Sequence, residues 1–400
     1  MINVSLSKRV KKIEPSPTLG LVAVAKNLKA QGHDVIGFGA GEPDFNTPDN
    51  IKAAGIQAIG DNCTHYTPNL GIKELRDAIC EKLEKENSLI YTPEQVIVSS
   101  GAKHSVFNTI MALCDVGDEV IIPSPYWVSY PEMVKIADGV PVVIATTSET
   151  GYKMTAEQLK DAVTSKTKVL FINSPNNPTG AVYTEKELKE IAQVCVENNI
   201  YVISDEIYEK LIYDNEKHVS IASFNEDIKK LTVTINGVSK AYAMTGWRIG
   251  YAVAEKEIIN AMDAFQSHAT SGAASISQKA SYEAIAGNQD AVEDMRKEFD
   301  KRRKFMVDEL NKIPGITCQL PKGAFYAFPD MTGLYGKTIA GVTVKDDNGF
   351  AKLLLEKVYV AVVPGSPFGS PGNLRLSYTN SIEYMKKGID RINDLVSGRI

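Results

Sequence analysis

Along this chain, short apolar runs typical of strands alternate with longer amphipathic segments typical of helices. Seven short runs are apolar or β-branched, and several are continuous, as expected of strands that are buried on both faces of a sheet. Longer amphipathic segments separate most of these runs and predict helices. The predicted strands are 95–99, 119–122, 141–144, 168–173, 201–204, 231–235 and 249–254. The predicted helices are 72–86, which precedes the first of these strands, and 103–114, 130–137 and 185–198, which lie between later ones.

This alternation predicts an α/β fold, with a large domain in which helices sandwich a mostly parallel seven-stranded sheet. A helix over 19–31 and a short strand over 35–39 precede the alternating region, and a long charged helix over 292–310 follows it. We therefore expect a smaller α+β domain built from both chain ends. The predicted division is an N-terminal arm and part of the small domain (1–47), a large domain (48–290) and a small C-terminal domain (291–400).

Composition narrows the functional classes. The chain has 400 residues, 44% of them hydrophobic, and a formal net charge of −5, which argues against a nucleic-acid or polybasic membrane partner. No stretch approaches the ~18 apolar residues of a membrane helix. Five scattered cysteines include no CxxC pair, which predicts reduced thiols in a cytoplasmic protein and no metal site.

Candidate chemistry follows the predicted strands, because ligands of an open parallel sheet bind beyond the carboxyl ends of its strands. Ser100, Gly101, Ala102 and Lys103 follow the first strand and open a helix. Small residues at a helix N-terminus form an anion site. The GxxxxGK spacing of a Walker loop is missing, and a plain strand-to-helix turn is the alternative.

Two later strands end in polar residues. Asn177 lies in a segment where two prolines and a glycine restrict the backbone and would hold its amide in place, although a capped turn explains the same residues. Asp205 follows the strand 201–204, with Tyr208 close behind. An acid at the end of a buried strand needs a cation or strong hydrogen bonds, whereas capping of a helix is its ordinary use.

Lys240 lies just past the strand 231–235. Desolvation favours its neutral amine, the nucleophile that forms a Schiff base, and a lysine that reaches water is the alternative. Taken together, these groups match the needs of pyridoxal 5'-phosphate. Its aldehyde needs Lys240, its phosphate the 100–103 turn and Arg248, its pyridinium nitrogen Asp205, and its phenolate oxygen Asn177 and Tyr208.

Four motifs in a fixed order carry a family resemblance. They are SPNNPTG at 174–180, SDEIY at 204–208, SKAYAMTGWRIGY at 239–251 and NLRLSY at 373–378. From about residue 14 to the C-terminus, the chain resembles the class I pyridoxal-phosphate aminotransferases of fold type I, and most of all the bacterial aspartate aminotransferases.

The resemblance implies a role for each of these positions. The catalytic residues would be Lys240, which forms the Schiff base and then moves the Cα proton, together with Asp205 and Tyr208. Trp127 would stack on the cofactor ring. Tyr66 would reach the phosphate of the other subunit, so that a homodimer shares its active sites. The implied cofactor-binding set is Lys240, Ser100, Gly101, Ala102, Lys103, Trp127, Asn177, Asp205, Tyr208, Arg248 and Tyr66.

The substrate residues that the resemblance implies include one departure from the best-studied aspartate enzymes. Those enzymes bind the distal carboxylate with a second arginine, yet this chain has no arginine between Arg248 and Arg296. In the similar bacterial subgroup a lysine and a hydroxyl serve instead, and they match Lys103 and Thr18. The implied substrate-binding set is Gly41, Trp127, Asn177, Arg375, Lys103 and Thr18.

Two further departures bear on the cofactor and the substrate. Gly237 occupies the position of a serine phosphate ligand, so Ser239 is not given that role. Members of the subgroup that transaminate prephenate carry a basic residue where this chain has Glu14, which predicts no prephenate activity.

The predicted function is that of an aspartate aminotransferase. L-Aspartate would give its amino group to the cofactor and leave as oxaloacetate, and 2-oxoglutarate would take the group and become L-glutamate, in a ping-pong reaction. An aromatic- or alanine-type aminotransferase, or a pyridoxal-phosphate C–S lyase, is the alternative on the same fold. A ligand-sensing regulator and a nicotinamide dehydrogenase are alternatives of other classes, and the chain shows no basic helix pair for the former.

Overall fold

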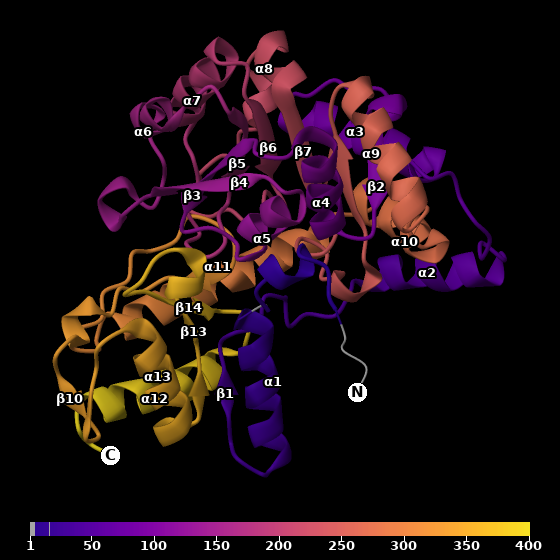
Figure 1. Cartoon of the computed structure of the whole chain (residues 1–400). Coiled ribbons are helices and arrows are strands. Elements are labelled where there is room, and N and C mark those ends of the chain that lie inside the picture. The colour runs from indigo at the N-terminus through magenta and orange to yellow at the C-terminus, as the bar shows by residue number, and fades with distance from the viewer. Residues whose placement is uncertain (1–4, 16) are drawn as a thin grey trace.

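The large domain is built around one seven-stranded sheet, in a computed structural model that describes residues 5–15 and 17–400 (Figure 1). Its strand order is β2-β8-β7-β6-β5-β3-β4. All strands are parallel except β8, which is antiparallel to both neighbours. The bounds are β2 (Val96–Ser99), β3 (Glu119–Ser124), β4 (Val140–Ala145), β5 (Thr167–Asn173), β6 (Tyr201–Asp205), β7 (Thr232–Gly237) and β8 (Gly250–Val253).

These strands confirm the predicted mostly parallel sheet, and each lies within two residues of its predicted bounds. The direction of β8 was not predicted. The chain turns back from β7 to β8 through a loop instead of crossing over through a helix, so the two strands run antiparallel. Gly237 and Gly250 are directly paired in this ladder. A Cβ at position 237 would lie 2.9 Å from the Cα of Gly250, so this pair needs glycine.

Helices cover both faces of the sheet because successive side chains of each strand point to opposite sides. On one face, Val120 of β3 and Val169 of β5 pack against α4 (Ala102–Leu113), α5 (Ser129–Ile136) and α9 (Lys256–Ala269). Ile121 and Leu170 pack against the other face. That face is covered by α3 (Lys73–Asn87), α6 (Ala156–Ala162), α7 (Glu185–Glu197), α8 (Glu226–Leu231) and α10 (Ser275–Ala286).

Both chain ends contribute to the smaller domain. Strand β1 (Ile36–Gly37) pairs with β12 (Val360–Ala361), and Ile36 and Phe38 share one core with residues of the C-terminal region. A second sheet has the order β13-β14-β9, with β9 (Tyr326–Ala327), β13 (Val363–Pro364) and β14 (Leu374–Ser377). The helices of this region are α1 (Pro17–Ala30), α12 (Asp347–Val358) and α13 (Ile382–Val396).

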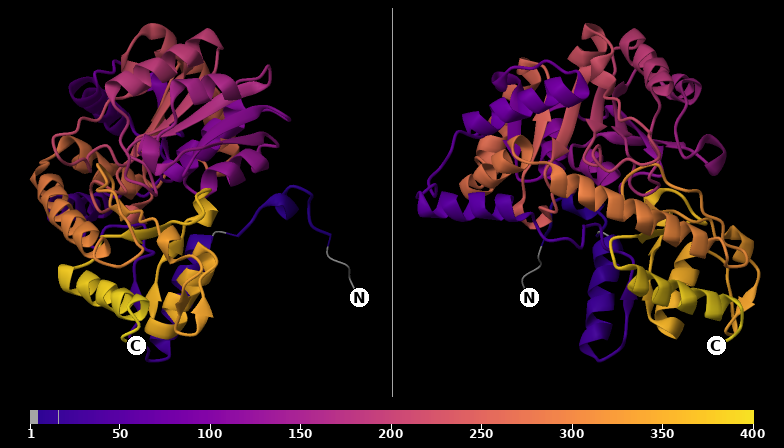
Figure 2. Two further views of the ribbon diagram at one scale, coloured as in Figure 1. Left: turned by 90° about the vertical axis from the view of Figure 1, so that its left-hand side faces the viewer. Right: turned by 180° about the vertical axis from the view of Figure 1, so that it is seen from behind.

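The long helix α11 (Asp290–Leu310) runs from the large domain along the smaller one, as the right-hand view of Figure 2 shows. The remaining elements are α2 (Asp49–Gly60), which packs on α10, and a short hairpin of β10 (Thr338–Ile339) and β11 (Val342–Thr343). The predicted domain boundaries at 47/48 and 290/291 and the cytoplasmic location stay predictions. Within the described ranges, no helix is long and apolar enough to cross a membrane.

A buried charged cluster ties the segment after β6 to α3. His218 Nε2 lies 2.7 Å from Oε2 of Glu206, and Lys82 forms an ion pair with Glu209. Asn87 donates a hydrogen bond of 2.8 Å to the same Glu209 carboxylate. Burial opposes ionisation of Glu209, but Lys82 and then His218 outweigh it and lower its pKa to about 2.

Protonated His218 stabilises this cluster. Burial alone would lower the pKa of His218, but the charges of Glu206 and Glu209 outweigh burial and raise it above the ordinary value of 6.5. A raised pKa in the folded state means that the stabilisation is fully present below pH 6.5. It is lost as the pH rises through the folded-state pKa.

We expect His218→Gln to lower the free energy of unfolding by about 3–5 kcal/mol at about pH 6, because Glu206 then loses its buried cationic partner. The difference from the wild type should shrink as the pH rises through the folded-state pKa of His218. Urea titrations over this range measure it, with His268→Gln on an exposed part of α9 as the control. A difference that stays constant with pH would contradict the role of His218.

Candidate active site

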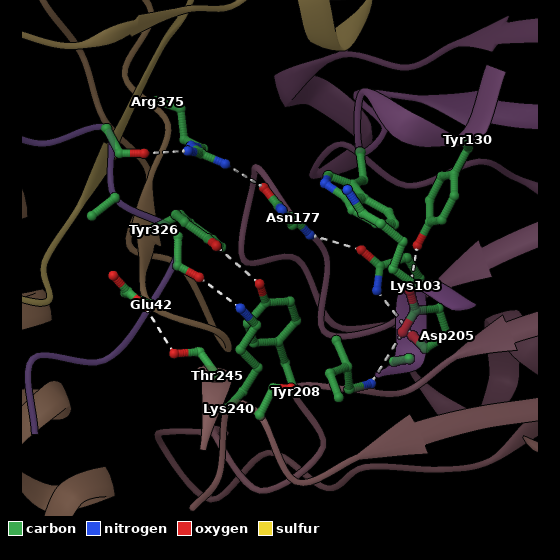
Figure 3. A pocket seen from close by; sticks show the side chains of 18 of the residues that line it. Glu42, Lys103, Tyr130, Asn177, Asp205, Tyr208, Lys240, Thr245, Tyr326 and Arg375 are labelled. Carbon is green, nitrogen blue, oxygen red and sulfur yellow. Dashed lines mark hydrogen bonds between the residues drawn. The ribbon is translucent and has the colours of Figure 1, made fainter. Parts of the chain in front are cut away.

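A cavity of about 470 Å³ lies at the carboxyl ends of the strands, between the sheet and the smaller domain (Figure 3). Its walls come from distant parts of the chain. The N-terminal segment contributes 39–42, the start of α4 contributes Ala102 and Lys103, and the smaller domain contributes Tyr326 and Arg375. The other lining residues are Trp127, Tyr130, Asn173, Asn177, Asp205, Ile207, Tyr208, Ser239, Lys240, Thr245 and Arg248.

Lys240 follows β7 and points its amine into this cavity. Its Nζ donates a hydrogen bond of 2.6 Å to the carbonyl oxygen of Gly41. The rings of Tyr208 and Phe325 lie about 6 Å from the amine, at 6.0 and 5.9 Å. Burial lowers the pKa of Lys240 to about 8, against the opposing effect of Glu42. About a tenth of the amine is then neutral at about pH 7, far more than for an ordinary lysine, and the neutral amine is the form that acts as a nucleophile or base.

Asp205 closes the floor of the cavity as a buried carboxylate. Its Oδ2 accepts a hydrogen bond of 2.7 Å from the hydroxyl of Tyr130, and its Oδ1 accepts one of 3.3 Å from the amide of Ile207. Burial raises the pKa of Asp205 to about 6, although both hydrogen bonds favour the ionised form. A cationic N–H group that approached this carboxylate would stabilise its charge further.

Asn177 and Arg375 form the opposite wall. Arg375 is 3% exposed, and its Nη1 donates to Oδ1 of Asn177 at 3.0 Å while its Nη2 donates to the carbonyl of Gly39 at 2.9 Å. The Nε of Arg375 is buried, and no acceptor for it lies in the part of the chain that the structure describes. The guanidinium also lies 4.6 Å from the ring of Tyr326. A buried cation with a free donor is suited to bind a carboxylate.

The turn before α4 meets a second guanidinium. Gly101 has φ +88°, and a Cβ there would lie 2.3 Å from Nη2 of Arg248. Arg248 donates to the carbonyl of Ser100 at 3.4 Å and to that of Thr245 at 2.9 Å. The first N–H groups of α4 have no partner within the helix. Together with the guanidinium they form a site for an anion such as a phosphate.

Lys103 provides a further cation near the mouth of the cavity. Its Nζ lies 4.7 Å from the ring of Trp127. Burial, and then the charge of Arg248, lower the pKa of Lys103. Two separate cations, Lys103 and Arg375, therefore face the same space from the large and the small domain.

The structure brings together most of the residues that the sequence predicts. Tyr208 lies in the cavity wall with its hydroxyl 2.9 Å from that of Tyr326, and a Cβ on Gly41 would lie 3.2 Å from the same Tyr326 hydroxyl. Ser100 and Gly101 do not line the cavity themselves, but both contact Arg248, which does. Tyr66, in contrast, is 99% exposed and is not among the residues that line the cavity. Thr18 lies in α1, but its side chain is outside the described part of the chain.

Sequence reasoning missed several residues of the site, among them Tyr130, Tyr326 and Glu42. Tyr130 and Tyr326 belong to apolar segments in which an aromatic residue is normally a core residue. Tyr130 does pack on Phe171, with ring centroids 4.4 Å apart, and only its hydroxyl reaches Asp205. Glu42, which accepts a hydrogen bond of 2.8 Å from Thr245, lies in the loop between β1 and α2. No local pattern distinguishes these residues.

Known proteins match almost the whole chain. The family model for aminotransferase class I and II matches residues 33–392. The aspartate aminotransferase of Bacillus sp. (strain YM-2) is 52% identical over 391 residues, which cover 98% of this chain and 99% of the relative.

Solved structures match equally broadly. The aspartate aminotransferase of Rhizobium meliloti superposes with a TM-score of 0.96 at 42% identity, over 99% of both chains. That of Thermus thermophilus with maleate has a TM-score of 0.92 at 42% identity, over 98% of this chain and 100% of the other.

We expect Tyr130→Phe to raise the pKa of Asp205 further, by about 1–2, because a hydrogen bond to a carboxylate is worth about 1.5–3 kcal/mol. Isotope-edited infrared titration of the cofactor-free protein measures the pH at which the protonated carboxyl signal disappears. Tyr126→Phe, whose ring packs on Gly369 instead, is the control. An unchanged titration in Tyr130→Phe would show that the phenol does not stabilise the carboxylate.

Proposed function

The chain belongs to the family of class I and II aminotransferases, and we propose that it acts on L-aspartate and 2-oxoglutarate. The single observation that carries this choice of substrates is the pair of cations across the cavity. Arg375 and Lys103 face one space from opposite walls, and a dicarboxylate can engage both. Maleate, with which the similar Thermus thermophilus enzyme was solved, is also a dicarboxylate.

Enzymes of this family depend on pyridoxal 5'-phosphate, and the residues of the cavity fit that cofactor. When bound, it supplies an aldehyde that condenses with amines and a pyridinium ring that withdraws electrons from the substrate Cα. The 100–103 turn and Arg248 would hold the phosphate, and Asp205 would accept a hydrogen bond from the ring nitrogen. Asn177 and Tyr208 would reach the phenolate oxygen, and Trp127 would cover a face of the ring.

Lys240 has two tasks in this proposal. Its amine, which burial makes easier to deprotonate by lowering its pKa to about 8, would hold the cofactor through the aldehyde, in a condensation that releases water. With the substrate in place, Nζ of Lys240 would be the base that takes the proton from the substrate Cα and gives it to the carbon of the cofactor that carried the aldehyde. The carbonyl of Gly41, which now accepts from Nζ, keeps the amine at this end of the cavity.

In this proposal Asp205 binds the ring nitrogen of the cofactor, and Arg375 binds the α-carboxylate of the substrate. The hydrogen bonds from Tyr130 and Ile207 favour ionised Asp205, and that charge would keep the ring nitrogen of a bound cofactor protonated. Arg375 would use its free Nε and its fork of N–H groups to bind the substrate α-carboxylate. With the carboxylate held, the Cα–H bond can face Lys240.

Lys103 would bind the distal carboxylate, and Thr18 is proposed as a second partner from the N-terminal region. Oxaloacetate and L-glutamate, the products, carry the same pair of carboxylates. The predicted absence of prephenate activity stays a prediction. Glu14, on which it depends, is exposed, and its backbone amide donates to Oε2 of Glu132 at 3.0 Å.

We expect Lys103→Ala to slow the half-reaction with L-aspartate by about 10–100-fold, since a charge-assisted hydrogen bond worth about 1.5–3 kcal/mol is lost. The half-reactions with L-alanine and L-tyrosine should change less than about threefold, because neither has a distal carboxylate. Stopped-flow absorbance of the bound cofactor measures each. Lys240→Ala is the reference variant and should lose the half-reactions with all three amino acids. Equal losses for all three amino acids in Lys103→Ala would contradict the assignment of Lys103.

A homodimer is part of the proposal, because Tyr66 projects away from its own cavity. It is 99% exposed, and Ile56 and Ile59 on the nearby α2 are 70% and 55% exposed. Tyr282 on α10, against which α2 packs, is also exposed at 42%. Exposed apolar side chains on neighbouring elements are typical of a surface that another chain covers. A second copy placed there would receive Tyr66 at its phosphate.

Hybrid dimers test this arrangement. We expect the Tyr66→Ala homodimer to bind the cofactor about 10–100-fold more weakly, through the loss of a hydrogen bond to phosphate. In a hybrid of one Tyr66→Ala subunit and one Lys240→Ala subunit, the site with an intact lysine would receive an intact Tyr66 from its neighbour. Its cofactor affinity, measured by titrating activity, should therefore return to the wild-type value. A hybrid as weak as the Tyr66→Ala homodimer would place Tyr66 outside the neighbouring site.

A further inference from the structure

One buried amide, that of Gln266 on α9, connects three segments of the large domain. The residue is fully buried, at 0% exposed. Its Oε1 accepts from the Ser99 hydroxyl at 2.7 Å and from Nδ2 of Asn108 at 2.9 Å. Its Nε2 donates to the carbonyls of Asn69 and Val98, each at 3.0 Å. All four hydrogen-bonding positions of the amide are therefore used.

Each partner of Gln266 leads to the proposed phosphate site. Ser99 and Val98 are the last residues of β2, directly before the turn at 100–103. Asn108 lies on α4, which begins at Ala102 within that turn. Asn69 lies three residues after Tyr66, which the proposed function assigns to the phosphate of the other subunit. The amide thus joins the strand that enters the turn, the helix that leaves it and the segment that carries Tyr66.

Gln266 lies beside an apolar core, where a side chain without hydrogen bonds would also pack. The apolar core on this face includes Val106, Ile110 and Met262, so that an apolar side chain at 266 would pack without any hydrogen bond. A polar group buried there costs free energy unless all its bonds are made, and each bond then fixes one geometry. A phosphate site depends on such geometry, because its N–H donors must converge on one anion.

We propose that Gln266 is a positioning residue for the cofactor phosphate. It holds the end of β2 and the body of α4 at the spacing at which the 100–103 turn and Arg248 converge. It does not itself touch the cofactor, and it acts through Ser99, Val98, Asn108 and Asn69. The inference rests on the proposed function, since it presumes that the anion at the turn is the phosphate of pyridoxal 5'-phosphate.

The test compares two ligands that differ only in the phosphate. Cofactor-free wild type and Gln266→Met, which keeps the side-chain length without the amide, are titrated with pyridoxal 5'-phosphate and with pyridoxal. We expect Gln266→Met to weaken binding of pyridoxal 5'-phosphate by about 10–100-fold and to leave binding of pyridoxal within about twofold. Inhibition of cofactor binding by inorganic phosphate should weaken in parallel.

Two further variants complete the experiment. Thr109→Val removes a buried hydroxyl between the same helices, which donates to Ser105 at 2.8 Å, and should leave the preference for the phosphorylated ligand unchanged. Ser99→Ala removes one of the four bonds and should lower that preference by a few fold. If Gln266→Met does not fold, Ser99→Ala takes its place in the same titrations.

The outcomes separate the inference from the function on which it rests. If Gln266→Met and Ser99→Ala weaken both ligands equally, or neither ligand, Gln266 has only a structural role and the inference is overturned. If the wild type itself binds pyridoxal as tightly as pyridoxal 5'-phosphate, the phosphate site at the turn is wrong, and the proposed function fails with it.

Discussion

Three backbone segments meet around Gly250 without side chains between them, and the active site depends on this contact. A Cβ at position 250 would lie 2.1 Å from the amide nitrogen of Ala102, at the start of α4. On its other side Gly250 pairs with Gly237 at the end of β7. The loop between these two glycines carries Lys240 and Arg248. Close packing here therefore places the amine, the guanidinium and the N-terminus of α4 at one cavity.

The adjacent residues Asp205 and Glu206 illustrate how the fold separates stability from chemistry. Glu206 belongs to a buried cluster in which His218 and two serine hydroxyls satisfy its carboxylate. Asp205 faces the cavity, where burial raises its pKa to about 6 although Tyr130, Ile207 and the charge of Lys240 favour its ionised form. Incompletely paired groups cost stability and are retained where a ligand completes them. Arg375, with its free Nε, is a second case on the opposite wall.

Much of the site could be predicted because its polar residues follow the ends of strands that the apolar pattern predicts. Lys240, Asp205 and Asn177 each follow a run of buried apolar residues, and the structure places all three in one cavity. Tyr130 and Gln266 could not be predicted in the same way. Their partners Asp205 and Ser99 lie 75 and 167 residues away, and no local periodicity reveals such contacts. Tyr66 is exposed, and the role proposed for it requires a second chain.

The sequence by itself determined the seven strands, several of the helices that accompany them and the residue types that suit one cofactor. Local periodicity carries this information, because alternating side chains must match the two faces of a sheet. Only the tertiary structure decided the direction of β8, the pairing of β1 with β12 inside the small domain and the hydrogen bonds of Gln266. These features follow from packing between segments that are distant in the chain, where shape and hydrogen-bond partners select one arrangement among many that the local pattern allows.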